Sequence, residues 1–374
     1  MHLVKSVFFI DVKTMKRQYI DASIDWRKTP IKWAEALGIS KEAVELYLEC
    51  KAIDLHIESF IWQRLGLYSL LKQNNKGAFG ARGYAQIDLP RALAAGMGGG
   101  VWSICTNPLR GAKNREKIFF DNLKEIRKTL NSHQDVSIVS NAREFDAAQA
   151  ANRYAIWLGI QGGNALDHNP QSLAQIPDKV ISRITLVHLM NSSLGSTSSP
   201  LRIRDHGLTA KGAEYIEVMN HERILVDLAH ISEKGFWQAL EVHDTSQPFL
   251  VSHTGVCGVH NMWRNINDLQ IKSVAKSDGV IGIIFHKGFL GKSRDGGHLD
   301  ALVDHMGHII DIVGEDHVAL GSDWDGAITT PNAMPTVLEL PRLVEEMLQR
   351  KWDANRIAKI LSHNYVRVFK AIRP

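Results

Sequence analysis

Short apolar runs alternate with amphipathic segments along most of the chain, and this alternation limits the possible folds more than any other feature of the sequence. Eight runs are mainly apolar and do not alternate with polar residues, as expected of strands that are covered on both faces: residues 52–57, 100–105, 154–160, 183–189, 223–229, 248–252, 279–285 and 318–322. Segments of helical period lie between them, including residues 116–130, 211–220, 233–242, 267–277 and 299–313. Strands joined by crossover helices pair in parallel, so the sequence predicts a (β/α)8 barrel of the TIM type.

The spacing of the runs leaves an extension before the barrel. Residues 11–49 are polar and partly helical, and Ser40 is a plausible N-cap for a helix that starts at Lys41. No linker rich in Pro, Gly or Ser divides the rest of the chain. We therefore expect an N-terminal extension over residues 1–50 and a single barrel over residues 51–374. Residues 136–140 form a ninth apolar run, which is surplus to an eight-stranded barrel.

Composition excludes several classes of function. The chain of 374 residues has a net charge of only +4, and its basic residues form no long run, so we expect no nucleic-acid partner. Three widely spaced cysteines indicate a reducing compartment, by default the cytoplasm, and no metal cluster of the Cys-x-x-Cys kind. No apolar run approaches the roughly 18 residues of a membrane helix, and residues 1–10 lack the apolar core and cleavage site of a signal peptide.

Polar side chains that can bind a metal or carry a proton follow several of the predicted strands. The carboxyl ends of barrel strands meet at one mouth, where the chemistry of such proteins takes place. The residues that we expect at this mouth are His56, Glu58, Gln161, His188, His230, His253 and Asp323. Imidazole and carboxylate groups suit zinc or a similar first-row ion. The sequence therefore predicts a metal-assisted hydrolytic site.

The other histidines are assigned by the same criterion. Five fall in predicted helices or connections, and we interpret them as structural or surface residues: His133, His243, His305, His308 and His317. His286 ends the seventh predicted strand, so its role is left open.

Seven segments, in order along the chain, resemble motifs of the renal (membrane) dipeptidase family of metal-dependent peptidases. The resemblance covers residues 52–372 and depends on the segments Ile-Asp-Leu-His-Ile-Glu from Ile53, Gly-Ile-Gln-Gly-Gly-Asn-Ala-Leu from Gly159, Thr-Leu-Val-His-Leu-Met-Asn from Thr185, Val-Asp-Leu-Ala-His-Ile-Ser from Val226, Ser-His from Ser252, Arg-Asn-Ile from Arg264 and Gly-Ser-Asp-Trp-Asp-Gly from Gly321. One such segment alone would be weak evidence, whereas seven in order are strong.

The resemblance implies a barrel that hydrolyses dipeptides at a two-zinc centre, in a family whose members are often dimers, so a homodimer is possible. It assigns metal-binding roles to His56, His230 and His253. His188 would polarise the scissile carbonyl or its oxyanion, Arg264 would bind the free carboxylate of the substrate, and Asp323 would move protons. These assignments agree with what metal-activated water needs: an ion to stabilise developing charge and a nearby carboxylate to carry the proton to the leaving amine.

Two residues depart from the family pattern, and both belong to the predicted metal centre. Glu58 stands where the family has Asp, and Gln161 stands where the family has the Glu that bridges the two ions. Two divalent ions about 3.5 Å apart repel by roughly 20 kcal/mol at an effective dielectric of about 20, and a shared carboxylate returns about 11 kcal/mol per ion on the same scale. A neutral amide returns far less, and its NH₂ group cannot bind a metal.

We therefore expect one well-occupied metal site, or none unless another ligand compensates. Two arrangements stay open: His56, His230 and Asp323 around a single ion, or His230 and His253 with the Gln161 oxygen. Two functions follow from the same residues. The first is a metal-dependent hydrolase for a dipeptide or a similar small amide with a free carboxylate. The alternative is a barrel that has lost this activity and binds a ligand or a partner protein.

Overall fold

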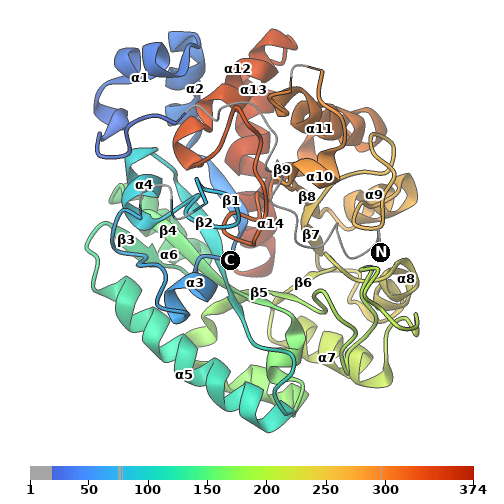
Figure 1. The fold of residues 1–374 in the computed structure, drawn as a ribbon. Helices are drawn as coiled ribbons and strands as arrows, with labels where there is room; N and C mark the ends of the chain where they lie inside the picture. The colour runs from blue at the N-terminus through green and yellow to red at the C-terminus, as the bar shows by residue number, and fades with distance from the viewer. Residues whose placement is uncertain (1–18, 75–76, 78, 295) are drawn as a thin grey trace.

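Eight parallel strands close into a barrel in the computed structural model of the chain, which describes residues 19–74, 77, 79–294 and 296–374 (Figure 1). In barrel order the strands are β1 (Ile53–Ile57), β2 (Gly99–Cys105), β4 (Tyr154–Gln161), β5 (Ile181–Thr185), β6 (Leu225–Asp227), β7 (Leu250–Thr254), β8 (Val280–Ile283) and β9 (Val318–Leu320). Strand β1 pairs with both β2 and β9, and β2 pairs with β4, which completes the ring. The predicted (β/α)8 barrel is confirmed.

The ninth apolar run forms a strand that lies outside the closed ring. This strand, β3 (Val136–Ile138), pairs with the first half of β4, from Tyr154 to Ile156. The second half of β4 pairs instead with β5, starting at Leu158. Because β4 is long enough to serve two neighbours on one side, the surplus strand extends the sheet without entering the barrel.

Helices surround the barrel on its outer face (Figure 1). The α-helices of the described residues are α1 (Pro30–Leu37), α2 (Lys41–Cys50), α3 (Phe60–Arg64), α4 (Leu89–Ala94), α5 (Ala112–Asn131), α6 (Ala142–Ala150), α7 (Ala210–His221), α8 (Glu233–Val242), α9 (Asp268–Lys276), α10 (Lys287–Leu290), α11 (Leu299–Val313), α12 (Pro341–Gln349), α13 (Ala354–Ala358) and α14 (Asn364–Ile372). The five helices expected from periodicity correspond to α5, α7, α8, α9 and α11.

Local sequence explains where several helices begin. Ser40 caps α2 as predicted, because its side chain accepts a hydrogen bond from the backbone N–H of Ala43. Asn267 and Gln270 form a capping box at the start of α9, in which each side chain accepts from the other's backbone N–H. Such caps satisfy donors that have no partner within the helix.

The predicted strands over residues 183–189 and 223–229 were too long at their carboxyl ends. Strand β5 ends at Thr185 and β6 ends at Asp227, and the residues that follow are loop. On the β6 side the chain turns at Ala229 and His230, and His230 has a left-handed backbone (φ 66°). The apolar character of these segments continues past the strands because the loops are themselves buried.

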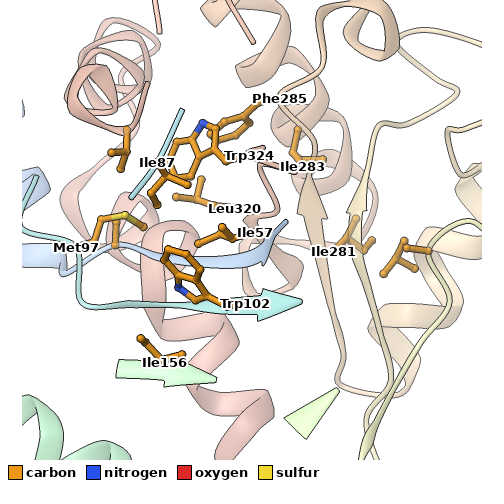
Figure 2. Close-up of a cluster of buried hydrophobic side chains, with 14 of the residues drawn as sticks. Ile57, Ile87, Met97, Trp102, Ile156, Ile281, Ile283, Phe285, Leu320 and Trp324 are labelled. Atoms are coloured by element: carbon orange, nitrogen blue, oxygen red, sulfur yellow. The ribbon is translucent and has the colours of Figure 1, made fainter. Parts of the chain in front are cut away.

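Buried apolar side chains fill the space around the strands near β1 and β9 (Figure 2). Trp324 is fully buried and packs edge to face against Phe285, with ring centroids 5.5 Å apart. Its backbone also pairs with β1, since Trp324 O accepts from Glu58 N, and His56 O accepts from Asp323 N. This packing fixes the loop after β9 against the end of β1, so that Asp323 lies beside His56.

Helices α1 and α2 pack on the carboxyl-terminal part of the chain, next to α12 (Figure 1). The buried Trp33 indole donates to the backbone carbonyl of Leu338, and Arg342 donates to the carbonyl of Leu37. Residues 1–18 of the predicted extension, and with them the segment 1–10 assessed as a possible leader, lie outside the described residues. The division into extension and barrel stays a prediction.

Two further findings concern the chain as a whole. Of the residues with a described placement, none belongs to a helix that is both long enough and apolar enough to cross a membrane. Cys50, Cys105 and Cys257 are free thiols.

Candidate active site

The residues predicted for the barrel mouth converge at the carboxyl ends of the strands. His56 and His253 lie within β1 and β7, Gln161 ends β4, and Glu58 directly follows β1. The remaining three, His188, His230 and Asp323, each lie three residues beyond the end of their strands. His230 and Asp323 both have left-handed backbones, with φ of 66° and 62°. These turns bring side chains from loops to the same point as side chains from strands.

Three imidazoles form the centre of this cluster. The Nε2 atoms of His230 and His253 are 2.8 Å apart, and the ring of His56 stacks on that of His253 with centroids 3.8 Å apart. The amide nitrogen of Gln161 lies 3.2 Å from His230 Nε2 and 3.4 Å from His253 Nε2. Burial lowers the pKa of all three histidines well below the usual value, so without a bound ion they are neutral at neutral pH.

Two carboxyl groups face His56 from the mouth. Glu58 Oε1 lies 3.1 Å and Asp323 Oδ1 3.6 Å from His56 Nε2. Burial raises the pKa of Glu58 and Asp323 well above the usual range, and for Glu58 the neighbouring Asp323 carboxylate adds to this effect. Carboxyl groups with a raised pKa beside a cavity are candidates for proton transfer to or from a bound molecule.

His188 and Arg264 lie on the other side of the cluster. The His188 ring meets His230 edge to face, with centroids 4.8 Å apart, and burial together with the charge of Arg264 lowers the pKa of His188 to about 4. Arg264 is buried and donates to the backbone carbonyl of His253. Burial lowers the pKa of Arg264 to about 10, so the guanidinium stays charged at neutral pH.

A cavity of about 240 Å³ opens over the cluster. Its polar lining includes Glu58, His188, His230, Arg264 and Asp323. Its apolar lining includes Ile61, Trp62, Trp263, Phe289 and Ile328. An apolar pocket with a few convergent polar groups is the usual form of a site for a small molecule. Two larger cavities adjoin it, one of about 950 Å³ that shares His230 and Arg264, and one of about 870 Å³ that shares His188.

The donor atoms at the mouth fit a metal ion. His56, His253 and Asp323 each offer a ligand atom, and these atoms lie within 4.8 Å of one another. Within the described residues, several buried atoms at the mouth have no hydrogen-bond partner: His56 Nε2, both carboxylate oxygens of Glu58, Gln161 Oε1 and His230 Nδ1. Buried polar atoms are normally satisfied, so this group of atoms calls for an ion or a polar ligand. Nitrogen and oxygen donors of this kind suit a first-row divalent ion.

Comparison with known proteins assigns the family. Residues 40–373 match the sequence profile described as membrane dipeptidase, peptidase family M19. The chain belongs to this membrane dipeptidase family. This confirms the resemblance inferred from the seven sequence segments.

Individual relatives agree with the family profile. An uncharacterised dipeptidase of Schizosaccharomyces pombe is 30% identical over 67% of this chain, and an uncharacterised protein in the pqqA 5′ region of Klebsiella pneumoniae is 36% identical over 44% of it. The chain covers 62% and 61% of the lengths of these relatives. A metallopeptidase of Rhodobacter sphaeroides, solved with a phosphinate mimic of the dipeptide L-Ala-D-Ala, has a TM-score of 0.76 at 21% identity, with 86% of this chain and 99% of that chain covered. This likeness shows the shared fold.

Two buried charged residues lie next to the imidazole cluster and were given no role in the sequence analysis. Below the imidazoles, Arg183 and Asp227 form an ion pair with no exposure to solvent, and Arg183 contacts His56. The sequence analysis did not single out either residue. The available signal was a charged side chain within an otherwise apolar predicted strand, which is costly unless it is paired.

The remaining histidines divide as the sequence suggested. The five interpreted as structural or surface residues make hydrogen bonds away from the 240 Å³ cavity: His133 with Asp135 N, His243 with Gln247 O, His305 with Val256 N and Leu290 O, His308 with Asp268, and His317 with Gly279 O. His286, which was left open, caps α10 through Gly288 N and lines the cavity. It is therefore a cavity-lining residue and not a member of the imidazole cluster.

Proposed function

We propose that this member of the membrane dipeptidase family is a metal-dependent hydrolase that cleaves the amide bond of a dipeptide or of a similar small amide with a free carboxylate. The observation that carries the proposal is that one cavity is lined by His188, Arg264 and Asp323 together with His230. A protein that only binds a ligand would not need a cation, a neutral imidazole and a carboxyl group of raised pKa within 240 Å³.

The residues of the cavity divide the work by their chemistry. Arg264 binds the free carboxylate of the substrate, since a guanidinium matches a carboxylate in shape and charge. His188, which is neutral, donates a hydrogen bond to the scissile carbonyl as negative charge develops on its oxygen. Asp323 accepts a proton from the attacking water and returns it to the leaving amine. A bound divalent ion would supply Lewis acidity and lower the pKa of the attacking water.

We propose zinc as this ion, in a single site. Gln161 supports a single ion, because a neutral amide offers no charge to offset the repulsion between two divalent ions. Two sets of ligands follow from the residues themselves. One uses His56 with Asp323 and a further histidine, and the other uses His230 and His253, with Gln161 contributing if its terminal amide turns to present the oxygen.

The free cysteines support a reducing compartment, and we include a cytoplasmic location in the proposal on that basis. A homodimer stays a prediction.

Replacement of Asp323 by asparagine tests the proposal. The variant keeps the shape of the side chain and removes the proton acceptor, so kcat for a hydrolysed dipeptide should fall by about 10³-fold while the melting temperature changes little. Asp121→Asn is the matched control, because Asp121 is exposed on α5 and pairs with Lys117 across one helical turn. Unchanged turnover in Asp323→Asn would contradict the assigned role.

A panel of substrates separates hydrolysis from binding alone. Protein loaded with zinc, manganese or cobalt is assayed against L-L and L-D dipeptides and against modified dipeptides. Turnover that depends on the metal supports the hydrolase. If the same dipeptides bind, as measured by calorimetry, and none is cleaved with any metal, the chain is the ligand-binding barrel of the alternative.

A further inference from the structure

Two imidazoles at the mouth, His56 and His253, stack on each other but contact opposite kinds of hydrogen-bonding group below the cluster. The Nε2 atom of His56 lies near Glu58 and Asp323, and that of His253 lies near His230 and Gln161. The two Nδ1 atoms face a buried set of polar side chains around the ion pair of Arg183 and Asp227. Which nitrogen of a histidine carries the proton is decided by the partner of the other nitrogen. The partners of the two Nδ1 atoms therefore determine what each Nε2 atom offers to an ion.

His253 has the partner that a metal ligand needs. Its Nδ1 lies 2.7 Å from the hydroxyl of Ser252, and this hydroxyl donates its only proton to Asp227. Ser252 can therefore only accept from Nδ1, so Nδ1 of His253 is protonated. Nε2 of His253 then presents a lone pair to the mouth. A hydrogen bond from the ring N–H to an acceptor is the usual arrangement behind a metal-bound histidine.

His56 has the reverse arrangement. Its Nδ1 lies 2.9 Å from a terminal guanidinium nitrogen of Arg183, which has donors and no lone pair. The Ser103 hydroxyl, at 3.4 Å, accepts from the same guanidinium nitrogen and has its own proton free for Nδ1. Nδ1 of His56 is thus the acceptor, and the proton of the neutral ring sits on Nε2. That Nε2 points toward Glu58, 3.1 Å away.

The position of Arg183 is fixed from several sides. One terminal nitrogen donates to Asp227 and to Thr185, each at 2.6 Å, and the other donates to Ser103 at 2.6 Å. Asp227 accepts in addition from Thr185, from Ser252 and from the backbone of Ala229. Neither charged side chain has any exposure to solvent. The guanidinium cannot turn away from His56 without losing these bonds.

We propose that the Arg183–Asp227 pair assigns the two stacked histidines different roles, so that one metal ion binds through His253 and its neighbour His230, while His56, which carries its proton on Nε2, does not bind the ion. An ion on Nε2 of His56 would force a protonated Nδ1 against the guanidinium. The permanent charge of Arg183 also disfavours a second cation on the β1 side. The inference rests on the proposed function for the existence of a metal site and chooses between its two ligand sets.

Zinc titration of two matched variants tests this assignment. Asparagine keeps a hydrogen-bonding group near the Nδ1 position and removes the Nε2 atom, so His56→Asn can accept from Arg183 and His253→Asn can donate to Ser252. Zinc affinity is measured by competition with a chromophoric chelator, with zinc alone and no substrate. We expect one zinc per chain in the wild type, a dissociation constant within about threefold of wild type in His56→Asn, and one raised at least about 100-fold in His253→Asn.

Anomalous diffraction at the zinc edge on wild-type crystals provides a test that needs no variant. The expected ion contacts His253 and does not contact His56 Nε2. Two bound ions, no bound ion, or an equal loss of affinity in His56→Asn and His253→Asn would overturn the proposal. Its failure is distinguishable from that of the proposed function: hydrolysis with an ion on His56 refutes only the ligand assignment, and one ion on His253 without turnover of any dipeptide refutes only the hydrolase.

Discussion

Replacement of Arg183 by methionine should destabilise the protein more than replacement of any exposed arginine. The side chains of Arg183 and Asp227 are completely buried, with a nitrogen–oxygen distance of 2.6 Å. Two unit charges whose centres are about 4 Å apart attract by roughly 4 kcal/mol at an effective dielectric of about 20. Removal of one partner of a buried pair costs about 3–5 kcal/mol, because the other charge stays buried without its counterion. We expect the free energy of unfolding of Arg183→Met to fall by about 4 kcal/mol.

A double-mutant cycle isolates the contribution of the pair. In Arg183→Met with Asp227→Asn, neither charge remains, so the loss should be smaller than the sum of the two single losses by about 3 kcal/mol. Unfolding in urea is followed by circular dichroism and by tryptophan fluorescence, whose transitions must coincide before free energies are compared. Measurement in the presence of a chelator removes any contribution of bound metal to stability.

Arg127→Met is the control for this cycle. Arg127 pairs with Asp178 at the surface, where the Asp178 side chain is 70% exposed, so its removal should cost less than about 1 kcal/mol. A loss below 1 kcal/mol in Arg183→Met, or strict additivity in the double variant, would refute the view that a buried charge pair supports the imidazole cluster.

Two further predictions concern ligands of the mouth. Gln161→Glu should raise zinc affinity at least tenfold, because a full negative charge then lies about 3 Å from the ion, while the number of bound ions stays at one. Chelator competition measures the affinity, and metal analysis measures the number of ions. Two bound ions would mean that the missing carboxylate alone limits the wild type to one ion. Arg264→Met should raise KM for a dipeptide by about 10- to 100-fold, the loss of a charge-assisted hydrogen bond, with little effect on the same dipeptide amidated at its carboxyl terminus. An equal effect on both substrates would show that Arg264 does not bind the carboxylate.

The barrel could be predicted from the sequence because its strands lie between the inner core and the outer helices. Both faces of each strand are covered, so strands appear as continuous apolar runs that are easy to separate from amphipathic helices. Residues at the carboxyl ends of such runs share one mouth, which is why His56 and His253 could be placed together from position alone. The same rule placed His188, His230 and Asp323 near the mouth although they lie in loops.

The contacts that distinguish the two stacked histidines could not be predicted in this way. Arg183 was visible only as the first residue of a predicted strand, and that position does not reveal whether its side chain points into the barrel or toward the outer helices. Its contact with Asp227 depends on the register between β5 and β6, which sets Thr185 beside Asp227. Register and side-chain direction follow from the closure of the whole barrel, so no local pattern in the sequence contains them.

Gln161 and Arg183 are separate departures from what a two-ion centre needs, and both favour a single ion. The neutral amide of Gln161 offers no charge to offset the repulsion between two divalent ions, whereas one ion on neutral imidazoles needs no such charge. An arginine beneath His56 would be unfavourable below a second ion, because the two positive charges would share one buried ring. With one ion on the β7 side, the amide of Gln161 contributes no charge, and the guanidinium of Arg183 is balanced by Asp227. The two residues therefore fit the same site, in which one metal ion binds at the mouth and the guanidinium of Arg183 is held beneath it.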